Sequence, residues 1–222
     1  MTVSLSAPAA ESVVLGTAEI FQAAFEHAGT RPSLPPGLVP TNPTLVTLLA
    51  IRVPDGPHGG FTFAQVRISC RSGARARALV TSSAVDASAE CAEWLAAGWG
   101  IGGDRAPIRY ERRFDRVHVT APHVDVSLRG LRPIGVDDVQ YVTGLHPVTT
   151  ASGDRLAQVE LEIALDRVER GRPELHACAV PGLDPRFPVV ATSAMGTLTL
   201  PKVRFVLDPD LPPHLGTERV AA

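Results

Sequence analysis

The chain has 222 residues, a formal net charge of −2 and only 5% aromatic residues. A near-neutral charge argues against a nucleic acid or an anionic membrane surface as partner. The scarcity of aromatic side chains argues against a stacking platform for single-stranded nucleic acid. The length favours a single domain over residues 1–222, in which we expect the ends, 1–17 and 209–222, to be flexible.

Cysteine usage and the start of the chain bear on the cellular compartment. The three cysteines are widely spaced and predict neither a disulfide framework nor a thiolate metal site. No basic patch followed by an apolar run opens the chain, and five prolines interrupt the longest uncharged run, residues 32–51. We therefore expect a soluble cytoplasmic protein with no membrane partner. The Ala, Gly, Pro and Arg bias suggests an actinobacterial or other high-GC source.

The first half of the chain reads mainly as strands. Residues 18–25 fit either a strand or a short helix, and a proline-rich connection follows. Residues 44–53 are apolar and β-branched, which predicts a buried strand. Residues 61–70 and 75–82 predict two further strands joined by a hairpin turn.

One helix is predicted, near residues 87–97. Ala and Leu fill its body, Asp86 is a candidate N-cap, and Gly98 is a candidate stop. After it, apolar residues alternate with polar ones over 117–128 and 159–165, which predicts half-buried strands. Long antiparallel strands with one good helix favour a mainly β fold closed into a barrel or cone, because a long open sheet would leave reactive edges.

The stretch "GWGIGG", residues 98–103, matches the glycine spacing of a dinucleotide-binding turn. Such a turn needs a strand before the glycines and a helix after them, so that the helix N-terminus meets the pyrophosphate. Here the order is helix, glycines, strand. The context therefore excludes a nucleotide, and we expect the glycines to end the helix and to let the backbone pass closely into the next strand.

The order of segments is similar to that of the acetoacetate decarboxylase-like family. The segments are "LPPGL" at 34–38, the strand with "FAQV" at 63–66, a hairpin, and the helix that ends in "EWLAAGWG" at 93–100. The resemblance covers roughly residues 19–207, and its closing strands fit only loosely. It implies a barrel fold and an interior site, which in this family carries a lysine that forms a Schiff base with a keto acid.

The sequence departs from the family at the lysine. The resemblance places Ile101 and Gly102 at the two lysine positions, and neither can form an imine. Gln65 takes the place of the strand glutamate near that lysine. Glu93 fits the family's Gly-Arg-Glu helix, with Ala92 in place of its arginine. Lys202 is the only lysine of the chain, and it either meets solvent or replaces the lost nucleophile.

Candidate catalytic residues follow from strand periodicity and from the resemblance. Phe63, Gln65 and Arg67 share one strand face, which the resemblance directs into the barrel. Arg67 could hold a carboxylate or an enolate there, or be an ordinary rim arginine. Tyr110 could offer a phenol to a polarised carbonyl, or simply pack.

The residues expected to bind the substrate are Phe63, Trp94, Trp99, Ile101 and Gly102. The two tryptophans either wall an apolar pocket or pack the helix onto the sheet. We expect Gly102 to leave room for a ligand where a lysine would otherwise project. No metal is expected, because His118, His123 and His176 lack further ligands at regular spacing.

These observations predict a cofactor-independent enzyme of bacterial specialised metabolism. The expected reaction is ring closure, dehydration or isomerisation of a polyketide-like or keto-acid intermediate held in the cavity without Schiff-base chemistry. Two alternatives remain: a non-catalytic protein that binds a lipophilic small molecule, and a decarboxylase that uses Lys202. The expected partner is the small-molecule substrate, and the sequence leaves a homo-oligomer open.

Overall fold

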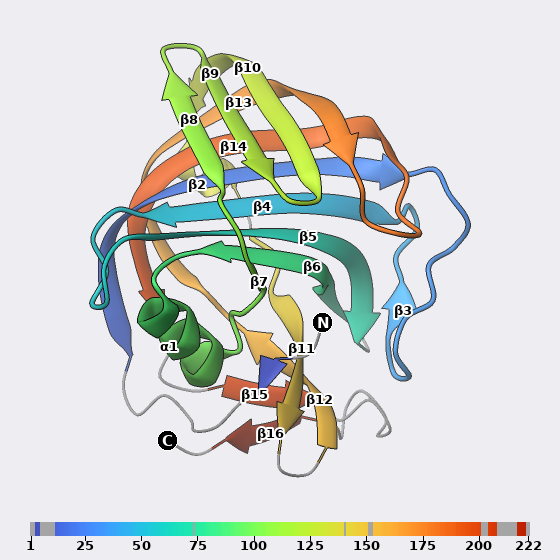
Figure 1. Cartoon of the computed structure of the whole chain (residues 1–222). Helices are drawn as coiled ribbons and strands as arrows, with labels where there is room; N and C mark the ends of the chain where they lie inside the picture. The colour runs from blue at the N-terminus through green and yellow to red at the C-terminus, as the bar shows by residue number, and fades with distance from the viewer. Residues whose placement is uncertain are drawn as a thin grey trace.

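The computed structural model describes residues 3–4, 12–72, 74–139, 141–150, 153–200, 204–207 and 217–220. One long, strongly curved sheet dominates this part of the chain (Figure 1). Its strands are β1 Val3–Ser4, β2 Val13–His27, β3 Val39–Pro40, β4 Leu45–Val53, β5 Phe61–Ser72, β6 Arg75–Asp86, β7 Asp104–Arg105, β8 Arg109–Arg113, β9 Arg116–Ala121, β10 Val124–Ile134, β11 Gly144–Thr150, β12 Gly153–Val159, β13 Glu162–Cys178, β14 Pro185–Leu200, β15 Arg204–Leu207 and β16 Thr217–Val220. The helices are α1, Ala89–Trp99, and the short 3₁₀ turn η1, Val136–Asp138.

The sheet is open rather than closed. Its main path runs β16-β15-β12-β11-β6-β5-β4-β2-β14-β13-β10-β9-β8, and among the described strands no pairing joins β8 to β16. Most neighbours are antiparallel, whereas β11 pairs with β6 in parallel. The expected mainly antiparallel β fold is therefore confirmed, but the closed barrel is not: the sheet is a curled half-barrel.

The β8 end of the sheet folds back over the outer face of the other strands. β13 makes this possible because its residues 162–170 pair with β14 while residues 168–178 pair with β10. Apolar side chains of β8, β9 and β10 then pack on the outward residues of β2, β4 and β5, including Phe21 and Leu48. The end of the sheet is thus used to cover an apolar face, and Figure 1 shows this second layer above β2 and β4.

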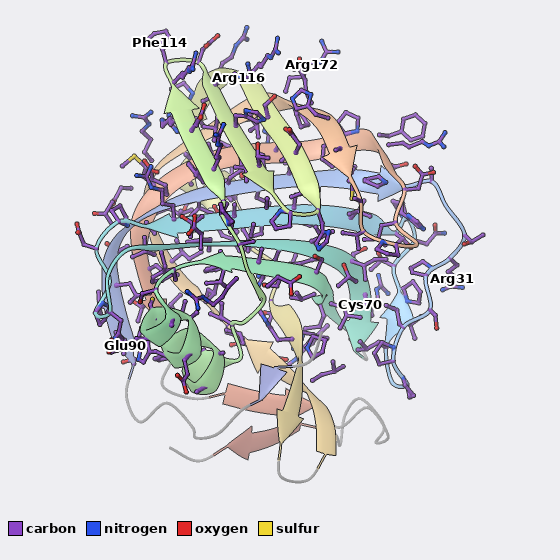
Figure 2. All side chains as sticks on the ribbon, viewed as in Figure 1. Arg31, Cys70, Glu90, Phe114, Arg116 and Arg172 are labelled. Carbon is purple, nitrogen blue, oxygen red and sulfur yellow. The ribbon has the colours of Figure 1, made fainter. Side chains whose placement is uncertain are left out.

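The inner, concave face of the sheet holds a second apolar cluster. Leu49, Ile51 and Phe63 from the sheet meet Leu95 and Trp99 from α1, all nearly inaccessible to solvent. Alternation along each strand separates the two clusters, because successive side chains point to opposite faces. Side chains fill both sides of the sheet in Figure 2, whereas Phe114, at the tip of the β8–β9 turn, points outward and is fully exposed.

The helix lies two residues further along the chain than predicted. Ser88, not Asp86, is the N-cap, and its hydroxyl accepts a hydrogen bond from the Cys91 amide at 3.1 Å. Gly98 lies within the helix, and Gly100 ends it in the left-handed region at φ 68°. Asp86 instead accepts a hydrogen bond from the Ile108 amide at 2.9 Å, so it anchors the chain after the helix.

The structure assigns the ambiguous residues 18–25 to β2, which also includes residues 13–17 and pairs with β14. Of residues 209–222, the part that is described, Thr217–Val220, is strand β16. Within the described ranges no helix has the length and apolar character that a bilayer span requires.

Candidate functional site

A cavity of about 230 Å³ opens on the concave side of the sheet. Strands β4 and β5 form one wall, and the segments 141–144 and 159–163 form the other. Its lining residues are Leu49, Ile51, Arg67, Tyr141, Val142, Thr143, Gly144, Val159, Glu160, Leu161 and Ile163. The volume suits a small organic molecule, and the wall mixes apolar side chains with several polar groups.

Arg67 is the buried cation of this cavity. It lies on β5 with only 6% of its surface exposed. Its Nε and Nη2 both donate to the side-chain oxygen of Gln65, at 3.0 and 2.6 Å, and its Nη1 donates to the Val142 carbonyl at 3.3 Å. These neutral acceptors fix the orientation of the guanidinium but leave its charge uncompensated.

No carboxylate of a described residue lies within ion-pair distance of Arg67. Burial lowers the pKa of Arg67 to about 10, so the group stays charged at neutral pH. The Gln65 amide nitrogen beside it is also buried, and among the described residues it has no hydrogen-bond partner. A buried cation and a buried unsatisfied N–H donor next to a cavity are costly unless an anion or a polar ligand binds there.

His146 lies close to Arg67. A methyl group built on Gly144 would meet His146 Nε2 at 3.0 Å and Arg67 Nη2 at 3.2 Å, so the two side chains flank the same point of the backbone. Burial, aided by the charge of Arg67 and opposed by a hydrogen bond with the Gly100 backbone, lowers the pKa of His146 to about 3. The imidazole is therefore neutral at physiological pH and adds no second charge to the site.

Two further polar groups line the cavity. The Tyr141 hydroxyl is buried and faces the Thr192 side chain without making a hydrogen bond of ordinary geometry, and burial raises the pKa of this phenol. Glu160 stays solvent-accessible and accepts a hydrogen bond from the Gln158 amide at 2.5 Å. The alternation over residues 159–165 predicts only a half-buried strand, whereas the structure places Glu160 in the wall of the cavity.

Among the candidate catalytic residues, the structure brings Gln65 and Arg67 together but places Tyr110 elsewhere. Tyr110 packs in the apolar cluster between β8–β10 and the outer face of the sheet. Glu19 and Ser193 are its polar neighbours there, and burial raises the pKa of its phenol. Sequence periodicity could not reveal this, because it does not say which face of the sheet β8 covers. Tyr141 is the phenol that lines the cavity.

The expected substrate-binding residues mostly form packing contacts. Phe63, Trp99 and Ile101 are core residues of the concave cluster, each with at most 2% of its surface exposed. Trp94 and Trp99 meet edge to face with ring centroids 4.8 Å apart, and Trp94 also contacts His58 at 5.1 Å. None of these residues is among those that line the cavity beside Arg67, and their part in binding stays a prediction.

Gly102 lines a different and much smaller space. With Gly100, Gly103 and His146 it borders a cavity of about 20 Å³, which has room for one water molecule and not for an organic ligand. Gly103 is required for packing, because an added methyl group would lie 2.3 Å from the Ser83 carbonyl oxygen. Lys202, the candidate replacement nucleophile, lies outside the described residues.

Known structures share this architecture. Acetoacetate decarboxylase from Legionella pneumophila superposes with a TM-score of 0.71 at 19% identity, covering 96% of this chain and 88% of that chain. A second acetoacetate decarboxylase structure gives 0.73 at 12% identity, with 89% of each chain covered. The chain has the acetoacetate decarboxylase-like fold.

A third structure with this fold is the enduracididine biosynthesis enzyme MppR in complex with pyruvate. It superposes with a TM-score of 0.67 at 15% identity, covering 87% of this chain and 89% of that chain. The sequence matches no protein-family model and no curated protein. The resemblance drawn from segment order is thus confirmed at the level of the fold.

Sequence reasoning missed His146, Tyr141 and Glu160. Leu145 and His146 belong to β11, which joins the sheet beside β6 in parallel, far from β5 in the sequence. The only local signal was an isolated histidine in an apolar strand, which by itself indicates a core residue as readily as a site residue. Nothing local predicts that this strand lies beside Arg67.

Proposed function

We propose that the cavity beside Arg67 binds a small carboxylic acid and that the protein is an enzyme acting on it without a cofactor. The observation that carries this proposal is the buried guanidinium of Arg67, which faces the cavity with only neutral partners among the described residues. A carboxylate or an enolate would supply the missing charge and accept from the unsatisfied Gln65 amide. A keto acid carries a carboxylate, and a keto acid or a polyketide-like intermediate can form an enolate.

The proposed chemistry is movement of a proton next to a polarised carbonyl. Arg67 would stabilise negative charge that develops on the substrate oxygen, because its hydrogen bonds to Gln65 and Val142 fix its orientation in advance. Glu160 lines the same cavity and could take the proton from carbon and return it at another position. Enolate formation of this kind underlies isomerisation, dehydration and ring closure, and it consumes no redox partner.

The fold supports a role in biosynthesis for the proposed enzyme. Acetoacetate decarboxylases and MppR, a biosynthetic enzyme whose structure holds pyruvate, share this architecture. We propose the same broad setting for this chain, bacterial specialised metabolism, but without an imine, because Ile101 and Gly102 stand where the resemblance places lysines.

A second candidate function is storage or transport of a lipophilic acid without turnover. The observation that favours it is the apolar part of the cavity wall, to which Leu49, Ile51 and Leu161 contribute. A decarboxylase that uses Lys202 is the third. These three candidates differ in what happens to a bound acid: it is rearranged, released unchanged or cleaved with loss of CO₂.

The binding step can be tested by calorimetric titration with pyruvate, acetoacetate and longer 3-keto acids. The Arg67→Gln variant should lose carboxylate binding by about tenfold or more, because it removes the buried charge. The matched control is Arg77→Gln. Arg77 is also a buried arginine, at 8% exposure, but it donates to Gln158 and does not line the cavity. Equal binding by both variants would contradict the proposal.

Turnover is tested separately, by mass spectrometry of acids incubated with the protein. A new product that disappears with Glu160→Gln, while calorimetric binding persists, supports the enzyme. Binding without any product in wild type favours the binding protein. A product lighter than the acid by the mass of CO₂, about 44 Da, would favour the decarboxylase. Its formation should then be abolished by Lys202→Arg, because the lysine must act as the nucleophile.

A further inference from the structure

Three side chains that can bind a metal meet on the outer surface of the β8–β10 layer. They are His118 on β9, Asp125 on β10 and His176 on β13, and one ligand atom of each lies within 4.8 Å of the other two. His118 Nε2 lies 2.6 Å from the Asp125 carboxylate, and the two imidazole rings are 5.7 Å apart, edge to face. His118 and Asp125 are half-buried, and His176 is exposed.

The strand pairing explains why these distant residues meet. Val117 and Val119 point into the apolar cluster under β9, so His118 between them points outward. On β10, Val124 and Val126 point inward and Asp125 outward in the same way. The register pairs His118 with Ser127 and Thr120 with Asp125, which puts His118 diagonally across from Asp125.

His176 reaches this surface through a β-bulge. β10 and β13 shift register between Asp125 and Val126, because Asp125 pairs with Ala177 while Val126 pairs with Leu175. His176 is the extra residue between these two pairs. A bulge leaves one residue unpaired and re-aims its side chain. The imidazole consequently lies over β10, where Ser127 and His176 Nε2 are 3.0 Å apart.

We infer that His118, Asp125 and His176 form a binding site for a divalent transition-metal ion of the Zn²⁺ type. Two imidazole nitrogens and one carboxylate are a ligand set that Zn²⁺ uses, with a fourth position left to water. Bound ligand atoms must approach to roughly 2.0–2.2 Å from the metal, which places them about 3–3.5 Å from one another. Small rotations of the side chains would bring the three ligand atoms to that spacing, with the 2.6 Å His118–Asp125 separation widening and separations of up to 4.8 Å shortening.

The arrangement also provides support behind the ligands. Ser127 is fully buried beneath the histidines and contacts the His176 ring, and Thr120 lies 3.5 Å from His118 Nε2. A metal at this point would link β9, β10 and β13, the strands that hold the outer layer together. It lies on the solvent-facing side of that layer, so it is separate from the cavity that contains Arg67, and the inference does not rest on the proposed function.

The test is a calorimetric titration of chelator-treated, untagged protein with Zn²⁺, combined with thermal unfolding with and without the ion. We expect one Zn²⁺ to bind and to raise the melting temperature, because an ion that binds only the folded state stabilises it. His118→Ala, His176→Ala and Asp125→Asn should each weaken Zn²⁺ binding by about tenfold or more. Asp125→Asn keeps the shape of the side chain and a hydrogen-bonding oxygen for His118 but removes the charge.

The matched control is His123→Ala. His123 is an exposed histidine on the same layer, 3.8 Å from the Asp104 carboxylate, and it is not one of the three grouped ligands. It should bind Zn²⁺ like wild type. Melting of the metal-free variants shows whether each remains folded. Absence of Zn²⁺ binding in wild type would overturn the inference, and so would binding that survives His176→Ala or falls equally with His123→Ala.

Discussion

The Arg67 guanidinium donates two hydrogen bonds to one oxygen of Gln65, at 3.0 and 2.6 Å. In a buried site a carboxylate would be the expected partner of an arginine. The amide instead holds the guanidinium in place while leaving its positive charge available to whatever enters the cavity. This relationship between two side chains of β5 is the basis of the first prediction.

Replacing Gln65 by glutamate should weaken carboxylate binding by about tenfold or more, because the new side chain would pair with Arg67 and neutralise it. Calorimetric titration with pyruvate or acetoacetate measures the change. Gln65→Leu is the comparison, since it removes the acceptor for Arg67 and the amide donor but adds no charge; it should lose less affinity than the glutamate variant. If the glutamate and leucine variants bind equally, charge compensation at Arg67 is not what controls binding.

His146 should make the protein sensitive to moderate acid. Burial and the charge of Arg67 lower its pKa from 6.5 to about 3. Between pH 6.5 and pH 3 the imidazole is therefore protonated in the unfolded chain but neutral in the folded one. The contribution of neutral His146 to the free energy of unfolding is complete above pH 6.5 and is lost as the pH falls toward 3, by up to about 1.4 kcal/mol per pH unit. Urea unfolding of wild type and His146→Gln between about pH 7 and pH 4.5 measures the difference.

The variant His146→Gln should show a flatter dependence of unfolding free energy on pH than wild type. Parallel curves for wild type and His146→Gln would mean that His146 is protonated in the folded protein at these pH values.

The glycines at the end of α1 should respond in opposite ways to alanine. Gly98 is helical and an added methyl group meets nothing within 4 Å, so Gly98→Ala should raise the free energy of unfolding by about 0.5–1 kcal/mol. Gly100→Ala should lower the free energy of unfolding by about 1–2 kcal/mol, because Gly100 has a φ of 68°. Gly103→Ala should cost more, since the methyl group would lie 2.3 Å from a backbone oxygen. Chemical denaturation ranks the three variants.

A destabilised Gly98→Ala would show that this glycine ends the helix, as its sequence position first indicated. A Gly103→Ala variant as stable as wild type would show that the backbone of β6 around Ser83 can move aside. The order of the three variants therefore tests the helix end independently of any ligand.

The protein should form no imine with a keto acid. Incubation with pyruvate or acetoacetate and borohydride, followed by intact-mass measurement, should show no adduct, because Ile101 and Gly102 cannot supply an amine. Lys202→Arg is the control, since Lys202 is the only lysine of the chain. An adduct that maps to Lys202 and disappears in that variant would restore Schiff-base chemistry to this protein.

Local sequence determined the parts of the site that lie on one strand. The alternation of β5 put Phe63, Gln65 and Arg67 on one face, because side-chain direction in a strand repeats every two residues whatever surrounds it. The principal helix and its place after a hairpin followed from equally local rules. Segment order was enough to indicate the fold.

Only the tertiary structure decided what each face meets. Tyr110 lies under the outer layer and Tyr141 in the cavity, although nothing in either local sequence distinguishes them. His146 reaches Arg67 through the pairing of β11 with β6, and His176 reaches Asp125 through one bulge in β13. The β8 end of the sheet packs its apolar side chains on the outward residues of β2 and β4. Such choices depend on long-range pairing and packing, which local periodicity does not encode.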